Sequence, residues 1–125
     1  MKILDTNILI YSGQPPYQEL LSPYIKDRAN AFSVISRVET LGFINITLKQ
    51  VQYFESIFLL LQPLPIESDI IEKAIELKQS KKMKLGDALI AASALAHNAE
   101  LITRNTEDFK SIPNLRVFNP LSGVK

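Results

Sequence analysis

Four acidic residues, each near a junction between a predicted strand and a predicted helix, could act together on a metal ion. They are Asp5, Glu39, Asp87 and Asp108. Asp5 ends an apolar run at the start of the chain, and a buried carboxylate is costly unless another group compensates its charge. Glu39 and Asp87 lie where helices are expected to begin, and Asp108 follows a later strand by a short turn. If the strands are parallel, all four residues lie along one edge of a sheet.

Such a cluster of carboxylates needs a cation. At ~4 Å and an effective dielectric constant near 20, each pair of like charges repels by roughly 4 kcal/mol. The ligands are oxygen donors, because the chain has no cysteine and a single histidine, His97. One or two Mg²⁺ or Mn²⁺ ions are therefore the expected cofactor. A site of this kind suits phosphodiester hydrolysis, in which metal activates water and stabilises the leaving oxygen.

Polar residues beside the four acids are expected to assist them. Thr103 and Asn105 can orient a carboxylate or a water molecule, and Thr6 or Asn7 can contact a phosphate. Arg37 and Arg104 flank acidic positions and are the preferred phosphate contacts. The predicted accessory residues are Thr6, Asn7, Ser36, Thr103, Arg104 and Asn105.

Each of these residues also has an ordinary structural explanation. Ser36 and Glu39 have the spacing of a capping box, in which Ser36 would be the N-cap of a helix. Asp87 could simply be a helix-initiating charge, and Asp108 a surface residue. Taken singly, only Asp5 favours a functional interpretation, and the convergence of four acids on one edge favours a shared site. His97 fits a helix end, and the basic stretch Lys81, Lys82 and Lys84 fits a solvated turn better than an RNA contact.

The elements that must position these residues alternate between strand and helix. Strands are predicted at Lys2–Leu4, Ala31–Ile35, Leu101–Thr103 and Arg116–Phe118, while the proline-flanked segment Leu64–Ile66 leaves a further strand open. The intervening segments have helical spacing of apolar residues, most clearly at Asp87–His97. This order predicts a three-layer α/β/α fold with a parallel sheet of four or five strands, and a site at the carboxyl ends of those strands.

Composition limits the remaining possibilities. The 125 residues are 46% hydrophobic, enough for one domain spanning residues 1–125, and the net charge of +1 gives no strong global attraction for nucleic acid or membrane. The absence of cysteine suits a reducing cytoplasm. The longest purely apolar run, from Ile57 to Leu61, is too short to span a bilayer, so a soluble cytoplasmic protein is expected.

The segment from Leu41 to Leu61 has more large apolar side chains than a one-sided helix requires. Phe43, Phe54, Phe58 and Leu61 are candidates for a dimer surface or for a groove that accepts a partner helix. Ordinary core packing is the competing interpretation.

Four sequence motifs, in order and over nearly the whole length, resemble those of a PIN domain, particularly the VapC-type ribonuclease toxins of prokaryotic toxin–antitoxin pairs. Each motif is weak alone, but the four together are specific. They are Leu4-Asp5-Thr6-Asn7-Ile8-Leu9-Ile10, Ser36-Arg37-Val38-Glu39-Thr40-Leu41, Gly86-Asp87-Ala88-Leu89-Ile90-Ala91-Ala92, and Leu101-Ile102-Thr103-Arg104-Asn105 running into Asp108-Phe109.

This resemblance implies a three-layer fold, Mg²⁺- or Mn²⁺-dependent cleavage of RNA, a cognate antitoxin and a homodimer. It places Asp5, Glu39, Asp87 and Asp108 in the family's acidic quartet, and Thr103 and Asn105 among its polar accessory residues. The family also contains nucleases outside toxin modules, so a non-toxin PIN nuclease is the alternative role.

Three alternatives are weighed against this interpretation. A receiver-type phosphoacceptor domain would need an Asp after the third strand and a Lys after the last, and neither Ile66–Ser68 nor Phe118–Pro120 supplies them. A haloacid-dehalogenase-like phosphatase would need a second acid where Asn7 stands. A catalytically inactive RNA-binding PIN domain is disfavoured because all four acids are present.

Overall fold

Five short strands form one sheet in which all neighbours run parallel. The computed structural model describes residues 1–123. The strand order is β3-β2-β1-β4-β5. The strands are β1 (Lys2–Leu4), β2 (Ala31–Ser33), β3 (Gln62–Leu64), β4 (Glu100–Ile102) and β5 (Val117–Phe118). The predicted parallel sheet is confirmed, with five strands.

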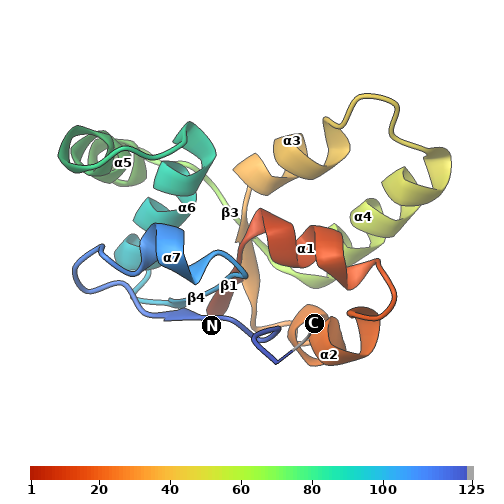
Figure 1. Cartoon of the computed structure of the whole chain (residues 1–125). Helices are drawn as coiled ribbons and strands as arrows, with labels where there is room; N and C mark the ends of the chain where they lie inside the picture. Colours follow the sequence, from red (N-terminus) through yellow and green to blue (C-terminus); the bar gives the residue numbers. More distant parts are fainter. Residues whose placement is uncertain (124–125) are drawn as a thin grey trace.

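Helices cover both faces of this sheet, which gives the predicted three layers (Figure 1). Helices α1, α2 and α4 lie on one side, and α5, α6 and α7 lie on the other. The helices are α1 (Thr6–Ser12), α2 (Gln18–Ile25), α3 (Ile35–Leu41), α4 (Leu48–Leu60), α5 (Ser68–Ser80), α6 (Leu85–Ala96) and α7 (Thr106–Phe109).

Successive strand residues point into two different cores, as the period of two along a strand requires. Ile3 and Leu101 pack against α5 and α6, whereas Leu4 and Ile102 pack on the other face with α1, α2 and α4. The first core includes many alanines of α6, whose small side chains allow the helix to lie close to the sheet. Both faces of β1 and β4 are therefore buried at these positions, which explains why the successive residues Ile3-Leu4 and Leu101-Ile102 are all apolar.

The strand order reverses at β1, and this places Asp5 at the centre of the sheet's carboxyl edge. The chain passes from β1 to β2 and β3 on one side, then returns to β4 and β5 on the other. Ligand sites of open parallel sheets form at such a reversal. The residues that follow β1, β2 and β4 therefore share the most favourable position in the fold for a site.

Helix α3 begins earlier than the capping pattern predicts. Val34 occupies the N-cap position and its side chain makes no capping hydrogen bond, while Ser36 lies inside the first turn and is fully buried. The backbone N–H of Ile35 instead donates to the hydroxyl of Ser33 at 3.3 Å. The capping-box interpretation of Ser36 and Glu39 is therefore wrong. A capping box is present at α4, where Thr47 is the N-cap and Gln50 is its partner.

The doubtful third strand is present but lies two residues earlier than the sequence segment Leu64–Ile66. Residues Gln62–Leu64 pair with β2 alone and form one edge of the sheet. Pro63 is tolerated there because an edge strand has no second neighbour that requires its missing N–H.

Three of the four apolar residues considered for a partner surface lie in the core. Phe54, Phe58 and Leu61 are 6%, 7% and 4% exposed, whereas Phe43 is 50% exposed. The surface hypothesis is wrong for the three buried residues. Across residues 1–123, no helix is long and apolar enough to cross a membrane.

Candidate functional site

Asp5 is held in place by the ends of two neighbouring strands. Its backbone N–H donates to the carbonyl of Ile102 at 2.9 Å, which continues the pairing of β1 with β4. Its carboxylate accepts hydrogen bonds from the backbone N–H of Thr6 at 2.8 Å and from the hydroxyl of Thr103 at 2.7 Å. Both carboxylate oxygens are thus oriented by the fold, and Asp5 serves as the N-cap of α1.

The charge on Asp5 is costly in the folded protein. Asp5 is 4% exposed. Burial raises the pKa of its carboxyl from 3.8 to about 6, and the negative charges of Asp87 and Glu39 act in the same direction. The hydrogen bonds from Thr103 and Thr6 oppose this increase without cancelling it. An uncompensated buried carboxylate of this kind is what a cation would stabilise.

A chain of hydroxyl groups orients Glu39 from the other side of Asp5. The Thr6 hydroxyl donates to Glu39 Oε1 at 2.6 Å and lies 2.7 Å from the Ser36 hydroxyl. Because Thr6 has one hydroxyl proton, which goes to Glu39, Ser36 must donate to Thr6. Ser36 therefore acts through Thr6 on Glu39, rather than on the end of α3.

Gly86 allows the carboxylate of Glu39 to lie against the first turn of α6. A Cβ at position 86 would lie 2.4 Å from Glu39 Oε2 and 3.1 Å from its Cδ, which is closer than side-chain carbons approach. Gly86 was not identified from the sequence as a functional residue. Its position immediately before Asp87, in a helix turn where glycine is destabilising, was the available signal.

Asp87 and Asp108 complete the group without comparable hydrogen bonds. All four acids line one open hollow of ≈ 270 Å³. Burial raises the pKa of Asp87 above its ordinary value, and the charges of Asp108 and Glu39 add to this, while Lys84 lowers it. The other residues that line the hollow are Thr6, Asn7, Ile10, Lys84 and Asn105.

The two asparagines near the hollow have different roles in the structure. The Asn7 side chain is occupied on both sides: its Nδ2 donates to the Thr103 hydroxyl at 3.4 Å, and its Oδ1 accepts from the Arg104 N–H at 3.3 Å. Asn105 is exposed, and its backbone N–H donates to Thr103 at 3.1 Å. Asn7 therefore stabilises the strand ends, and the Asn105 side chain is the one available to a substrate.

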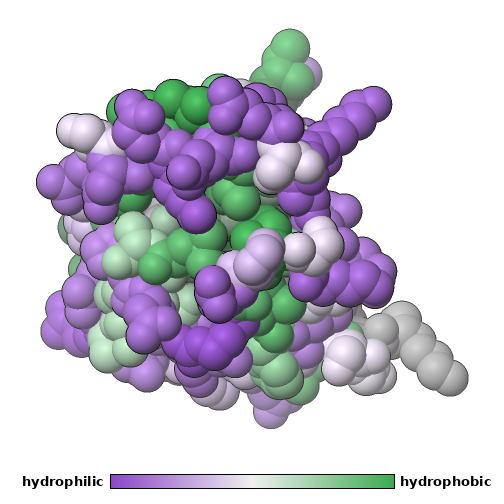
Figure 2. All heavy atoms as spheres, turned by 90° about the vertical axis from the view of Figure 1, so that its left-hand side faces the viewer, coloured by the Kyte–Doolittle hydropathy of each residue, from purple (hydrophilic) through white to green (hydrophobic). Residues whose placement is uncertain are grey.

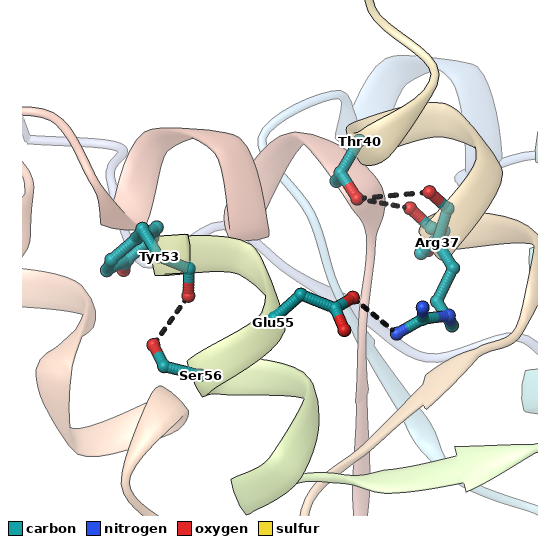
Figure 3. Close-up of polar contacts among 6 residues, drawn as sticks. Arg37, Thr40, Tyr53, Glu55 and Ser56 are labelled. Carbon is teal, nitrogen blue, oxygen red and sulfur yellow. Dashed lines mark hydrogen bonds and ion pairs between the residues drawn. The ribbon is translucent and has the colours of Figure 1, made fainter. Parts of the chain in front are cut away.

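Neither arginine expected to contact phosphate lines the hollow. Arg104 lies over the rings of Tyr11 and Tyr17, with its Cζ 4.8 and 5.5 Å from their centroids. Arg37 reaches from α3 to α4, where its Nη1 lies 2.9 Å from Glu55 Oε1 (Figure 3). Lys84, which the sequence pattern assigned to a solvated turn, is the cationic residue that does line the hollow.

The donor atoms of this site are of the kind that a divalent cation prefers. The potential ligands are carboxylate oxygens, which hard cations such as Mg²⁺ and Mn²⁺ prefer. No lysine or arginine among residues 1–123 forms an ion pair with any of the four acids. In the same part of the chain, no three carboxylate or histidine side chains already form a group that could hold a metal ion.

A model of the PIN domain matches residues 2–115 of the chain. The chain belongs to the PIN-domain family. The match includes Asp5, Glu39, Asp87 and Asp108, together with the strands and helices that bring them to one edge. Membership of this family excludes the receiver-type and haloacid-dehalogenase alternatives.

Relatives of this PIN domain include named ribonucleases and toxin–antitoxin complexes. It is 40% identical over 70 residues to "Ribonuclease VapC" of Rickettsia bellii, a match that covers 54% of this chain and 52% of that protein. The match thus spans about half the length of that relative. The structure resembles a toxin–antitoxin complex from Klebsiella pneumoniae, with a TM-score of 0.77, 36% identity, and coverage of 96% of this chain and 98% of that one. It also resembles VapBC2 from Rickettsia felis bound to a promoter DNA fragment, with a TM-score of 0.78, 26% identity, and coverage of 94% and 97%.

Proposed function

We propose that this PIN domain is a metal-dependent endoribonuclease that hydrolyses phosphodiester bonds in RNA. The observation that carries the proposal is the convergence of Asp5, Glu39, Asp87 and Asp108 on one hollow at the carboxyl edge of the sheet. Helix capping does not require this convergence. The ribonuclease named among the relatives supports the same activity.

The four acids are the proposed ligands of one or two Mg²⁺ or Mn²⁺ ions. A divalent ion bound there would make water a stronger nucleophile and stabilise charge on the leaving oxygen. Thr103 and the Thr6 N–H hold Asp5 in a fixed orientation, and the Thr6 hydroxyl does the same for Glu39. Because Asp87 and Asp108 have no such side-chain contacts, their carboxylates are free to adjust when a cation binds.

The remaining residues of the hollow have proposed roles in binding RNA. The exposed side chain of Asn105 is placed to contact a phosphate or a ribose hydroxyl beside the acids. Ser36 and Asn7 position other site residues through Thr6 and Thr103. Arg104, held over Tyr11 and Tyr17, is proposed to contact RNA beyond the hollow.

The biological role proposed for the chain is that of the toxin in a toxin–antitoxin pair. The toxin–antitoxin complexes among the structural relatives support a cognate antitoxin as partner, with a homodimer of this cytoplasmic single domain as the active assembly. A hollow of ≈ 410 Å³ between α1 and α4, lined in part by the exposed Phe43 and by Tyr53, could receive a partner's apolar side chains. A small reading frame directly upstream whose product copurifies with the chain would support this role, and its absence would favour a nuclease outside a toxin module.

The activity is tested by cleavage of single-stranded RNA with added Mg²⁺ or Mn²⁺. The wild-type protein is expected to cleave, and both EDTA and the Asp5→Asn substitution are expected to abolish cleavage. Glu72→Gln, which removes an exposed carboxylate from α5, is the matched control and should retain activity. Equal cleavage by wild type and Asp5→Asn, or cleavage that persists in EDTA, would contradict the proposal.

A further inference from the structure

A second hollow, with a different charge character, opens directly beside the acidic one. It has a volume of ≈ 470 Å³, and its lining includes Lys81, Lys82 and Lys84. It also shares Asp87 and Asp108 with the acidic hollow. Because Lys84 and both acids line the two hollows, one trough leads from the acidic residues to the lysines. This trough lies between α7 and the segment that joins α5 to α6. Figure 2 shows the side of the molecule that carries α5 and α6, where hydrophilic side chains surround a central apolar area.

The basic segment between α5 and α6 is held in position by three contacts. The backbone N–H of Lys81 donates to the carbonyl of Leu77 at 3.1 Å. The ammonium of Lys78 donates to the Met83 carbonyl at 2.9 Å, and the ammonium of Lys81 donates to the Ser111 hydroxyl. The lysines therefore belong to a defined surface beside the acids.

No ion pair within residues 1–123 neutralises the three lysines of this surface, although the charge of Lys84 acts on the nearby Asp87. The ion pairs among residues 1–123 are Arg37–Glu55, Lys73–Glu76 and Lys110–Glu107, so none of the three lysines has a carboxylate partner. Glu107, the additional acid in the hollow, is already paired with Lys110 at 2.6 Å. Three ammonium groups without a carboxylate partner in the described part of the chain therefore lie together, although the net charge is only +1.

We propose that Lys81 and Lys82 form a phosphate-binding subsite for the nucleotides that flank the cleaved bond. This inference rests on the proposed ribonuclease function. A lysine ammonium is a compact charge suited to a phosphate, and the subsite offers no aromatic ring on which a base could stack. Its continuity with the acidic hollow favours an RNA strand over an acidic protein segment as the occupant. The bound strand then runs from the acids past Lys84 toward the end of α5.

An RNA-binding experiment tests this subsite. The non-cleaving Asp5→Asn protein is titrated into a fluorescein-labelled single-stranded RNA, and the fluorescence anisotropy is measured over a series of salt concentrations. Adding Lys81→Gln and Lys82→Gln should weaken binding and lower the slope of log affinity against log salt by about 0.7 for each phosphate that a lysine no longer neutralises. The matched control adds Lys26→Gln and Arg28→Gln, exposed cationic residues outside all three hollows described above, which makes the same change in net charge. Replacing Lys81 and Lys82 by arginine should restore the affinity.

The outcomes separate this inference from the function on which it rests. If the wild-type protein cleaves RNA but the glutamine variant and the control have equal affinity and salt slope, the subsite is wrong while the function stands. If the wild-type protein cleaves no RNA, the proposed function fails first. If RNA binding is unchanged but copurification of an antitoxin is abolished, the lysines serve a protein partner and the proposal is overturned. The single Lys82→Gln variant, which alters an exposed side chain, answers the same question should Lys81→Gln disturb folding.

Discussion

The four acids divide into two pairs that the protein treats differently. Asp5 and Glu39, the hydrogen-bonded pair, accept bonds from hydroxyl groups on neighbouring elements at 2.7 and 2.6 Å. Asp87 and Asp108, the open pair, line the same hollow, and their carboxylates accept no hydrogen bond from any residue in the described part of the chain. The fold thus fixes half of the site through its own polar network and leaves the other half to respond to a ligand.

This difference follows from how each residue is attached to the sheet. Asp5 directly follows the central strand, where desolvation would make an unsupported carboxylate very unfavourable, so its oxygens are paired. Asp87 and Asp108 lie on helices at the rim, where water can reach them. Partial burial nevertheless raises the pKa of Asp87, and repulsion from Asp108 and Glu39 raises it further. We infer that the cation which relieves this repulsion completes the site.

Asp5→Asn should give the largest effect, and it should separate activity from stability. RNA cleavage is expected to fall by about 10³-fold or more, the upper range for loss of an essential catalytic group. The folded pKa of about 6 exceeds the ordinary 3.8, so ionised Asp5 destabilises the fold. Below pH ~4 the Asp5 carboxyl is protonated and carries no such penalty. As the pH rises through 6, its ionisation lowers the free energy of unfolding by about 3 kcal/mol in total when no metal is bound.

Urea unfolding in EDTA, at pH values from 4 to 7.5, measures this dependence. The difference in free energy of unfolding, Asp5→Asn minus wild type, should increase with pH over that interval. A difference that stays constant would show that burial of Asp5 does not penalise its charge, and the distinction between the two pairs would lose its basis.

Gly86→Ala acts on Glu39 of the hydrogen-bonded pair and should reduce RNA cleavage less than Asp5→Asn does. The new Cβ would displace the Glu39 carboxylate, so cleavage should fall by about 10-fold, as when a residue that orients a metal ligand is removed. Stability should stay constant or rise by ~0.5–1 kcal/mol, because alanine favours a helix more than glycine. Gly123→Ala, where the added carbon meets no other residue within 4 Å in the described part of the chain, is the control. Full activity in Gly86→Ala would show that the position of Glu39 is unimportant.

Thr6→Val should have the smallest effect and test the hydroxyl chain itself. Valine keeps the shape of threonine but cannot donate to Glu39, so cleavage is expected to fall by several-fold, and stability by about 1 kcal/mol for the missing buried hydrogen bond. Thr40→Val is a matched control, since the Thr40 hydroxyl is also buried and donates to the Ser36 carbonyl at 2.8 Å, but contacts none of the four acids. Thermal unfolding and RNA cleavage measure both variants. Equal losses of activity in the two would assign the Thr6 effect to general destabilisation.

The parallel sheet and the grouping of the acids could be predicted because they depend on signals that are local in sequence. A strand followed by an acid, repeated through alternating strands and helices, places those acids at one edge whatever the details of each turn. The helix start at Thr47 is equally local, because both partners of its capping box lie within one turn of the helix.

The roles of Ser36, Gly86 and the lysines could not be predicted because they depend on contacts between distant segments. Ser36 and Glu39 have capping-box spacing, yet both interact with Thr6, which lies 30 residues before Ser36 and 33 before Glu39. A Cβ at position 86 would collide with the Glu39 carboxylate only because the fold places α6 beside α3. Helical periodicity likewise identified the apolar face of α4 without showing that the protein's own core covers Phe54 and Phe58.

The most direct test of whether the two pairs form one cation site is a calorimetric titration with Mn²⁺. The proteins compared are the wild type, Asp108→Asn and the Glu72→Gln control. Asp108 is the informative residue because no hydrogen bond connects its side chain to the other three acids. Wild type and control should bind Mn²⁺ with the same saturable affinity, and Asp108→Asn should bind at least about 10-fold more weakly, as expected for a metal ligand. Equal affinity of Asp108→Asn and the wild-type protein would contradict the account of a single shared site.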